Sequence, residues 1–547
     1  MTTATGLTSI AGSTALRLGC RKALILLMVG TAAAGALSRP GSAQDARAAV
    51  SAPAECAALQ GSRGAITVDA ATPIPANQHW QAEAVRGAAP PPVEAAFCRV
   101  AGRIEGNIGF ELWLPARWNG RMLGAGVGGD AGVFNYRDMA VRVAQGFATV
   151  TTDSGHKATQ TRWMSSPKAR VDYEHRAVHL TAEAAKELIA RYYGRKSDRA
   201  YYLGCSGGGR QALKEMQNYP GDYDGVVAGA PGPYMPLQSV RMLWSALAQK
   251  HDPAAMLADA DWSLYESSVT AACDRNDGVA DGIVANPATC RFNSRTLLCR
   301  PGQHDGCLAA PKLAMIDMIR APMPDENGRP MDRGLFPGVR TRPGPPSPLL
   351  RAMWADGVYD NPAWDEDSFR RTADLAAANR AMPELRADRT AIAPFIAAGH
   401  KAIIYQGWQD PSTNAAPTIE YYARLAAANA GPARLADAVR LFMVPGMYHC
   451  SGGPGANLFG GSGHAPLSGT PSHDVLWALI HWVEQGEAPQ RIVATRVENG
   501  RELFTRPLCP FPRSARFRAR PQDQASSYSC TVDPSLTPML RWKALVR

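Results

Sequence analysis

The sequence predicts an α/β fold, in which a mostly parallel sheet is flanked by helices and interrupted by one large insertion. Three observations indicate this fold. Short apolar runs alternate with amphipathic stretches, a glycine-flanked serine stands between such a run and such a stretch, and the alternation stops for ~155 residues before it resumes. The chain has 547 residues, which exceeds the roughly 250–300 residues at which a single hydrophobic core stops growing, so an insertion or a second domain is expected.

The predicted strands are short runs of nearly unbroken apolar character, as expected for strands that are covered on both faces. They lie at residues 109–114, 122–126, 147–152, 200–204, 225–228, 402–405 and 441–444. Amphipathic helices are predicted between or after them, at residues 175–193, 208–218, 418–428 and 473–485. This alternation is typical of a parallel sheet with helical connections.

The strand–helix alternation is absent from residues 234–391. That segment holds four cysteines, a proline-rich stretch at 337–348 and many tryptophans and aspartates, and strand-like runs resume at Lys401. The sequence therefore predicts a core domain made of residues 44–233 and 392–547, with a lid domain of residues 234–391 inserted into it. The C-terminal stretch from Pro507 onward is predicted to be irregular.

Residues 1–43 have the pattern of a signal peptide. Arg17, Arg21 and Lys22 precede an apolar run at residues 23–37, and small residues at 41–43 supply a cleavage site. The run is about 15 residues long, shorter than the ~20 residues needed to span a bilayer, and a membrane anchor is the alternative interpretation. We therefore expect a periplasmic or secreted protein without a membrane-bound segment after cleavage.

Charge and cysteine content limit the classes of partner. Removal of residues 1–43 takes away four basic residues and no acidic one, which lowers the formal net charge from +10 to +6. This excess is spread without runs, so no nucleic-acid partner is predicted. Ten cysteines remain, an even number that predicts disulfides in an exported protein, and no CxxC pair indicates a metal site. They are Cys56, Cys98, Cys205, Cys273, Cys290, Cys299, Cys307, Cys450, Cys509 and Cys530.

Ser206 is the predicted nucleophile. Residues 204–208 form a G-x-S-x-G motif that follows one apolar run and opens the helix at 208–218. A sharp strand-to-helix turn with small flanking residues exposes the serine hydroxyl at the edge of the sheet, as in the nucleophile elbow of an α/β-hydrolase. A flexible glycine-rich loop is the alternative, and a phosphate-binding loop is excluded because no Gly-Lys-Ser/Thr follows.

In an α/β-hydrolase the acid and the base follow the nucleophile in the chain, on loops after later strands. Asp410 follows the run at 402–405, and His449 follows the run at 441–444 and a Pro-Gly turn. A solvated turn is the alternative for Asp410. The remaining late histidines are better explained as structural, because they lie in a loop that follows no strand or on the last helix: His464, His473 and His481.

Cysteines stand beside both candidate residues. Cys205 precedes Ser206, and Cys450 follows His449. A disulfide between them would hold their Cα atoms within ~4.4–6.8 Å and would tie nucleophile and base together across about 240 residues of sequence. Coincidence is the alternative interpretation.

These dipeptides resemble the tannase and feruloyl esterase family, which also includes the mono(2-hydroxyethyl) terephthalate hydrolases. The resemblance extends from about Cys56 to Cys530 and is carried by segments 152–156, 204–211, 219–231 and 449–450. It implies an α/β-hydrolase core with an inserted lid and a triad of Ser206, Asp410 and His449, and no organic cofactor is expected. It also implies five disulfides: Cys56–Cys98, Cys205–Cys450, Cys273–Cys290, Cys299–Cys307 and Cys509–Cys530.

The reaction expected from this triad is acyl transfer through Ser206, with His449 as proton acceptor and Asp410 orienting its ring. The Gly207 N–H and a second N–H, from the loop at 126–129, would stabilise the oxyanion. The family's Gly-Asn-Gly-Gly is here Gly-Val-Gly-Gly, and Gly128 and Gly129 are the two candidates for the second donor.

An acidic loop at residues 273–283 is the candidate metal site. It packs three aspartates among glycine turns, and oxygen ligands at this density suit Ca²⁺, although the loop lacks the ligand spacing and final glutamate of an EF-hand. An exposed turn is the alternative. Similarity to the family's lid calcium site implies a structural Ca²⁺ held by the side chains of Asp274, Asp277 and Asp281 and the carbonyls of Val279 and Ile283.

The family acts on small or polymer-linked esters of aromatic acids, and the triad does not select among feruloyl, galloyl and terephthalate esters. Trp354, Tyr359 and Trp364 are candidate aromatic contacts in the lid, with burial in the core as the alternative. Thr413 and Gly207 stand where the terephthalate hydrolases carry an aromatic residue and a glutamate, which argues against efficient terephthalate-monoester hydrolysis. The sequence therefore predicts a feruloyl-esterase-like enzyme, with a tannase next. A peptidase is the rival enzyme, and a non-catalytic exported binding protein is the alternative from a different class.

Overall fold

The computed structural model describes residues 52–341, 344–465 and 469–546, and the predicted signal peptide at residues 1–43 lies outside them. In this part of the chain ten strands form one sheet, in the order β1-β2-β3-β4-β6-β5-β7-β8-β9-β10. The strands from β6 to β10 are paired in parallel, whereas β1 to β4 extend the sheet with antiparallel pairing and β4 joins β6 antiparallel. This is the mixed α/β architecture that the sequence predicts.

All seven predicted strands are present. They are β4 (Ile108–Pro115), β5 (Arg121–Ala125), β6 (Ala148–Thr152), β7 (Arg199–Cys205), β8 (Gly225–Gly229), β9 (Lys401–Gly407) and β10 (Val439–Val444). Every residue of β4, β6 and β8 is buried, which explains their unbroken apolar runs. Three further strands precede them and are not predicted from the sequence, because their mixed exposure gives no such run: β1 (Gly61–Arg63), β2 (Ile66–Ile74) and β3 (Phe97–Ile104).

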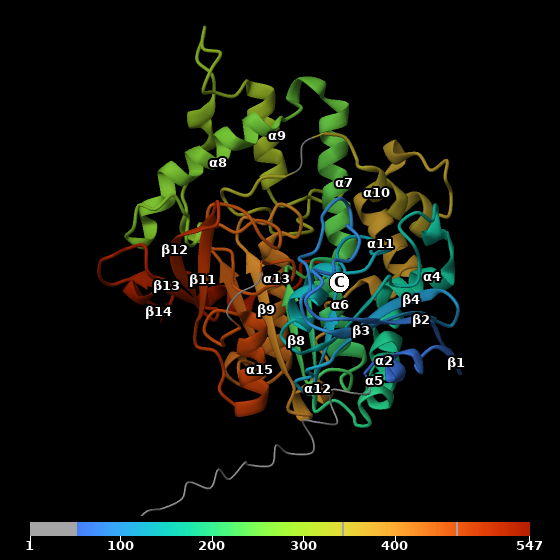
Figure 1. Cartoon of the computed structure of the whole chain (residues 1–547). Helices are drawn as coiled ribbons and strands as arrows, with labels where there is room; N and C mark the ends of the chain where they lie inside the picture. The colour runs from blue at the N-terminus through green and yellow to red at the C-terminus, as the bar shows by residue number, and fades with distance from the viewer. Residues whose placement is uncertain (1–51, 342–343, 466–468, 547) are drawn as a thin grey trace, which may run out of the picture. The chain divides into compact units, whose positions relative to one another are not determined.

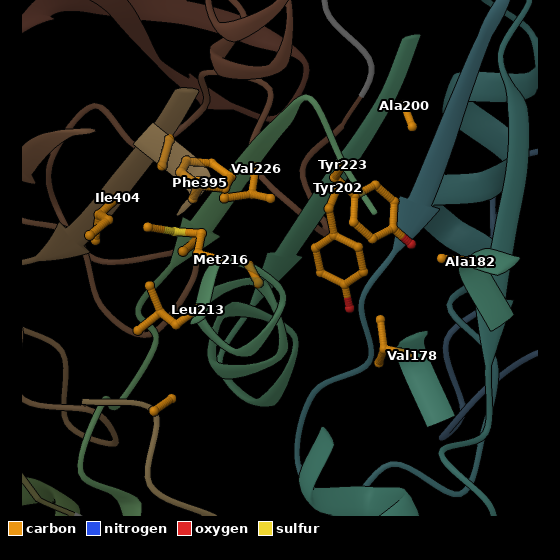
Figure 2. Close-up of a cluster of buried hydrophobic side chains, with 14 of the residues drawn as sticks. Val178, Ala182, Ala200, Tyr202, Leu213, Met216, Tyr223, Val226, Phe395 and Ile404 are labelled. Atoms are coloured by element: carbon orange, nitrogen blue, oxygen red, sulfur yellow. The ribbon is translucent and has the colours of Figure 1, made fainter. Parts of the chain in front are cut away.

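Helices cover both faces of the parallel strands. On one face, side chains of β7, β8 and β9 pack against α5 (Ala177–Tyr193) and α6 (Gly207–Asn218), and Figure 2 shows Tyr202, Val226 and Ile404 near Leu213, Met216 and Val178. On the other face, alternate residues of the same strands pack against α15 (Val475–Gln485). Burial of each large apolar side chain contributes roughly 1.5–3 kcal/mol. The start of α6, which carries the candidate nucleophile, is therefore fixed on a well-packed core.

The remaining helices outside the insertion are short, apart from one. They are α2 (Ala52–Ala57), α3 (Tyr136–Val143), α4 (Pro167–Val171), α12 (Ala393–Ala397), α13 (Ala415–Ala428) and α14 (Pro432–Leu435). Helix α13 corresponds to the helix predicted at 418–428. None of the helices in the described ranges has the length and hydropathy that a bilayer span requires.

Residues 234–391 form helices and add no strand to the sheet within the described part of the segment. The helices are α7 (Met235–His251), α8 (Asp259–Cys273), α9 (Ala310–Arg320), α10 (Pro348–Ala352) and α11 (Arg371–Ala381), and α7, α8 and α9 lie together at the top of Figure 1. The two ends of the segment meet, because Tyr234 and Arg386 form an isolated β-bridge and the Ala387 N–H donates to the Pro233 carbonyl over 2.8 Å. This meeting of the ends supports the predicted lid boundaries, which stay a prediction.

The C-terminal region contains two β-hairpins. Strands β11 (Ile492–Glu498) and β12 (Arg501–Leu508) form the first, and β13 (Arg513–Phe517) and β14 (Tyr528–Val532) form the second. The prediction of an irregular stretch from Pro507 onward was therefore wrong. The second hairpin escapes detection because its strands are short and half-exposed, with arginine or serine at alternate positions in place of an apolar run.

Candidate active site

Ser206 lies at a sharp turn between β7 and α6. Its backbone has φ 60° and ψ −124°, a left-handed conformation that costs a non-glycine residue about 1–3 kcal/mol. The Ser206 N–H donates to the Gly229 carbonyl of the neighbouring strand β8 over 2.9 Å, which holds the turn in place. The turn presents the hydroxyl beyond the carboxyl end of β7, as the nucleophile-elbow prediction requires.

His449 and Asp410 reach the same point from two later strands of the sheet. His449 comes after β10 and Asp410 after β9, and the carboxyl ends of parallel strands lie along one edge of a sheet. His449 Nε2 lies 2.8 Å from Ser206 Oγ, and His449 Nδ1 lies 2.9 Å from Asp410 Oδ2. The structure thus brings the three predicted residues into one hydrogen-bonded chain.

The Asp410 carboxylate is fully buried and is fixed by four further donors. The N–H groups of Ser412 and Thr413 each donate to Oδ1 over 2.8 Å. The Thr413 hydroxyl and the Gln406 amide contact Oδ2 at 2.8 and 3.1 Å. Thr413, predicted as a substrate contact, therefore orients the Asp410 carboxylate, and neither this contact nor that of Gln406 is predicted from the sequence.

A disulfide joins Cys205 to Cys450 with a Cα–Cα distance of 6.0 Å, so the residues next to Ser206 and His449 are covalently linked. Cys450 has φ 64°, and its carbonyl lies 2.8 Å from His464 Nε2. His464 Nδ1 accepts the N–H groups of Phe459 and Gly461, so the proton lies on Nε2, and burial lowers the pKa of this imidazole. His464 is structural, as expected, and it supports the turn that carries His449.

The other four disulfides are those that the resemblance implies. Cα–Cα distances are 5.6 Å for Cys56–Cys98, 5.4 Å for Cys273–Cys290, 4.8 Å for Cys299–Cys307 and 5.5 Å for Cys509–Cys530. All ten cysteines of the described residues are thus paired, and the fold is disulfide-stapled as the sequence predicts.

The candidate oxyanion loop, residues 126–129 after β5, lies directly on the start of α6. A Cβ atom added to Gly128 would lie 3.8 Å from Ser206 Cβ, and one added to Gly207 would meet the Gly129 carbonyl at 2.9 Å and the Val127 carbonyl at 3.0 Å. Contacts that close require glycine at 207. Gly129 has φ 65°, which also favours glycine. In the described ranges the N–H groups of Gly128 and Gly129 have no hydrogen-bond acceptor, so either is free to bind an oxyanion.

A cavity of about 750 Å³ opens above Ser206 and His449. Its wall is mainly apolar and includes five methionines, contributed by the lid and by the segment before α4: Met164, Met235, Met242, Met353 and Met382. Thr413 lines the cavity, whereas Trp354, Tyr359 and Trp364 do not. The prediction that these three side chains contact substrate is therefore not met. Trp354 and Trp364 are buried in a hydrophobic cluster, and the Tyr359 hydroxyl contacts Asp374.

The acidic loop at 273–283 brings its aspartates near one another without directing them at one point. Asp274 Oδ1 accepts the N–H groups of Asp281, Gly282 and Ile283, and Asp281 Oδ2 lies 2.6 Å from Arg506 Nη2. The Asp277 carboxylate accepts the Val279 N–H over 3.0 Å. Over the described residues, no three acidic, histidine or cysteine side chains converge as metal ligands. The loop fits Ca²⁺ in its residue types but not in this arrangement.

Burial, together with the nearby carboxylates of Asp281 and Asp274, raises the pKa of Asp277 to about 6. Burial also raises the pKa of Asp281, although Arg506 opposes that shift. In both residues burial is the main cause, and the carboxylates of neighbouring aspartates shift the pKa in the same direction. The calcium site stays a prediction.

Comparison with known proteins gives one consistent result. The profile of the family described as "Tannase and feruloyl esterase" matches residues 93–338 and 353–531. An uncharacterised esterase of Xanthomonas campestris is 34% identical over 88% of this chain and 92% of its own length, and a probable feruloyl esterase B-2 of Neosartorya fischeri is 33% identical over 78% and 85%. The crystal structure of feruloyl esterase B from Aspergillus oryzae superposes with a TM-score of 0.82 at 27% identity and covers 88% of this chain and 100% of that one.

Proposed function

Since the chain belongs to the tannase and feruloyl esterase family, a family of carboxylic ester hydrolases, we propose that it is a serine esterase that hydrolyses esters of aromatic acids, with feruloyl-type esters preferred. The observation that carries the proposal is the hydrogen-bonded chain from Asp410 through His449 to Ser206 at the floor of the cavity. The relatives' names support the ester class.

The reaction follows from the order of these contacts. His449 Nε2 accepts the Ser206 proton while Oγ attacks the ester carbonyl, and Asp410 at Nδ1 stabilises the imidazolium. The Gly207 N–H and the N–H of Gly128 or Gly129 meet the oxyanion, and each such donor is worth roughly 3–4 kcal/mol of barrier. The imidazolium then protonates the departing alcohol, which leaves an acyl-enzyme on Ser206. Water, deprotonated by His449, releases the aromatic acid.

The lining of the cavity favours a methoxylated or unsubstituted ring over a galloyl ring. Methionine sulfur makes favourable contacts with aromatic rings, each worth about 0.3–1.5 kcal/mol. A galloyl ring carries three hydroxyls that lose free energy on burial unless they find acceptors. Among the lining residues Asp130 is the one carboxylate, and it already pairs with Arg86 at 2.9 Å. The glycine required at 207 likewise argues against a terephthalate-type site with a glutamate at that position.

Export is part of the proposal. The signal-peptide pattern at residues 1–43 and five disulfides support a periplasmic or secreted enzyme, because disulfides persist in oxidising compartments. We also propose a structural Ca²⁺ near Asp274, Asp277 and Asp281. It would require these carboxylates to turn from the backbone N–H groups and from Arg506 towards a common point.

Side-by-side assays test the proposal. We expect the mature protein to release acid from methyl ferulate at least tenfold faster, in kcat/KM, than from methyl gallate or a terephthalate monoester, and to leave peptide anilides intact. A fluorophosphonate probe should label Ser206, as peptide mapping would show. Absence of both ester hydrolysis and labelling would favour a non-catalytic binding protein, and preference for the gallate would make the protein a tannase.

A further inference from the structure

We propose that Gln211 is a positioning residue that holds the oxyanion loop, residues 126–129, in register with the nucleophile. The inference rests on the proposed function and deepens it. Gln211 lies on α6, the helix that begins immediately after Ser206, and is 2% exposed. The side chain reaches from the helix that carries the nucleophile to the loop that carries the second candidate oxyanion donor.

Both ends of the Gln211 amide are occupied. Oε1 accepts the Val127 N–H over 3.1 Å and the Tyr202 hydroxyl over 2.8 Å, while Nε2 donates to Ser154 Oγ over 3.1 Å. Two donors on one side and an acceptor on the other fix the orientation of the amide. Val127 immediately precedes Gly128, so the position of its N–H sets the position of the donor next in the chain.

The other side chains that contact this loop hold its carbonyl groups. Asn135 Nδ2 donates to the Gly126 carbonyl over 2.7 Å, and the Tyr173 hydroxyl donates to the Gly129 carbonyl over 3.0 Å. Arg86 contacts the Gly128 carbonyl at 3.5 Å. Across the described part of the chain, Gln211 is the one side chain that accepts an N–H from residues 126–129. The Gly126 N–H donates to the Leu203 carbonyl of β7 over 2.9 Å, so Gln211 and this carbonyl bind the first two N–H groups of the loop, and those of Gly128 and Gly129 have no acceptor in the described ranges.

Among the described residues, Gln211 makes the one hydrogen bond between a side chain of α6 and this loop, beside the backbone bond from Gly126 to Leu203 of β7. A Cβ atom on Gly126 would meet the Tyr202 hydroxyl at 2.7 Å and the Gly208 Cα at 2.8 Å, so backbone lies against backbone here. Two backbone segments that touch at glycines have no side chains that would stop one from sliding along the other. A shift of the loop by a fraction of an ångström would weaken the oxyanion contact while the floor and wall of the cavity stay in place.

The segment 152–156, which carries part of the family resemblance, gains a role in this arrangement. Ser154 has φ 65° and is fully buried, and its hydroxyl accepts the Gln211 amide. The Asp153 carbonyl also accepts the Gly132 N–H over 3.0 Å, just beyond the loop. The segment is therefore connected to the oxyanion loop through Gln211, which bonds to Ser154 with its amide nitrogen and to Val127 with its amide oxygen.

Variants of Gln211 test the proposal on the full-length mature enzyme. Gln211→Leu removes the acceptor, and Gln211→Glu keeps an accepting oxygen for Val127 and Tyr202 while the Ser154 hydroxyl turns to donate. Gln217→Leu is the matched control, because Gln217 lies on the same helix but contacts the Ala387 carbonyl and the Tyr421 hydroxyl. The readouts are kcat, KM, Tm and the inhibition constant of an aryl boronate, which forms a tetrahedral adduct in the oxyanion hole.

We expect Gln211→Leu to lower kcat 10- to 100-fold, since loss of one oxyanion donor costs about 10²–10³ and a misplaced donor keeps part of its effect. The boronate inhibition constant should rise by a similar factor while KM changes less than threefold. Gln211→Glu should stay within fivefold of wild type, and Gln217→Leu should leave kcat and boronate affinity unchanged. The proposal is overturned if Gln211→Leu keeps both values within threefold, or if kcat falls in step with Tm while boronate affinity stays unchanged.

A second variant keeps the test decisive if Gln211→Leu does not fold. Tyr202→Phe removes only the second donor to Oε1, and it should lower kcat and boronate affinity together by two- to fivefold. No change in either would overturn the proposal. A wild-type enzyme that neither hydrolyses esters nor reacts with fluorophosphonate would instead remove the proposed function itself, so the two failures are distinguishable.

Discussion

The predicted triad and the acidic loop at 273–283 hold their side chains in different ways. Ser206, Asp410 and His449 come from three loops far apart in sequence, yet they join within 2.9 Å. Asp274, Asp277 and Asp281 lie within eight residues of one another, yet their oxygens face backbone N–H groups and Arg506. A position at the end of a paired strand therefore predicts convergence of side chains better than closeness in sequence does.

The difference has a physical cause. Pairing in one parallel sheet places the carboxyl ends of β7, β9 and β10 along the same edge. Residues just beyond those ends therefore lie close together, regardless of the sequence between the strands. A short loop has no such frame, and aspartate side chains readily bond to nearby backbone N–H groups within a turn. Such a loop needs an external ligand, such as the proposed cation, before its carboxylates point one way.

The largest difference between the two clusters is expected in kcat/KM, when one residue of each cluster is substituted. Ser206→Ala should lower kcat/KM by roughly 10⁴- to 10⁶-fold, because the nucleophile of a triad acts as one unit with its base. The Tm should stay within about 2 °C, since the packed residues of α6 and β7 are unchanged. Asp274→Asn should instead lower Tm and reduce kcat/KM less than tenfold. Steady-state kinetics with methyl ferulate and a thermal melt measure both, and a Ser206→Ala enzyme that retains turnover would contradict the assignment.

A smaller effect is expected from the disulfide that clamps the triad. Cys205→Ser with Cys450→Ser opens a loop of 245 residues, and the chain-entropy estimate for such a loop is about 5.5 kcal/mol. The matched control is Cys299→Ser with Cys307→Ser, whose loop of eight residues gives about 2.5 kcal/mol by the same estimate. Only the first pair should also lower kcat, at least tenfold, because it frees the turn that carries His449. Equal losses of kcat in the two variants would show that the clamp does not position the base.

Some features of the site can be predicted from the sequence and others cannot. The strand ends and the order Ser, Asp, His were readable because strands buried on both faces leave unbroken apolar runs. The hydrogen bonds of Gln406, Gln211 and His464 were not, since a lone polar residue in an apolar stretch gives no spacing pattern until its partners are known. The exchange of β5 and β6 in the sheet order was also beyond the sequence, because both strands have the same buried character.

The misses in the fold have the same origin. The N-terminal strands and the arginine-bearing hairpin β13–β14 alternate between exposed and half-buried residues, so their pairing depends on neighbours and not on local hydrophobicity. The lid tryptophans illustrate the converse. From the sequence alone, Trp354 and Trp364 fit either burial in the core or contact with substrate. In the structure both are buried in one hydrophobic cluster with Phe369 and Leu375.

The smallest expected effect, and the one that decides the second cluster, is the response of stability to calcium at two pH values. The folded-state pKa of Asp277 is raised to about 6 from its ordinary value of 3.8, so this group stabilises the metal-free fold fully below pH 3.8 and loses that contribution as pH rises through 6. Bound Ca²⁺ would need the ionised carboxylate and would cancel the loss. Addition of Ca²⁺ to chelator-treated protein should therefore raise Tm by a few degrees at pH 7.5 and by less than one degree at pH 4.5. Asp277→Asn should abolish the difference, and Mg²⁺ serves as the control cation. If Ca²⁺ leaves Tm unchanged at pH 7.5, the loop does not bind Ca²⁺ and is a turn neutralised by Arg506. Its aspartates then differ from the triad because no ligand brings their carboxylates to a common point.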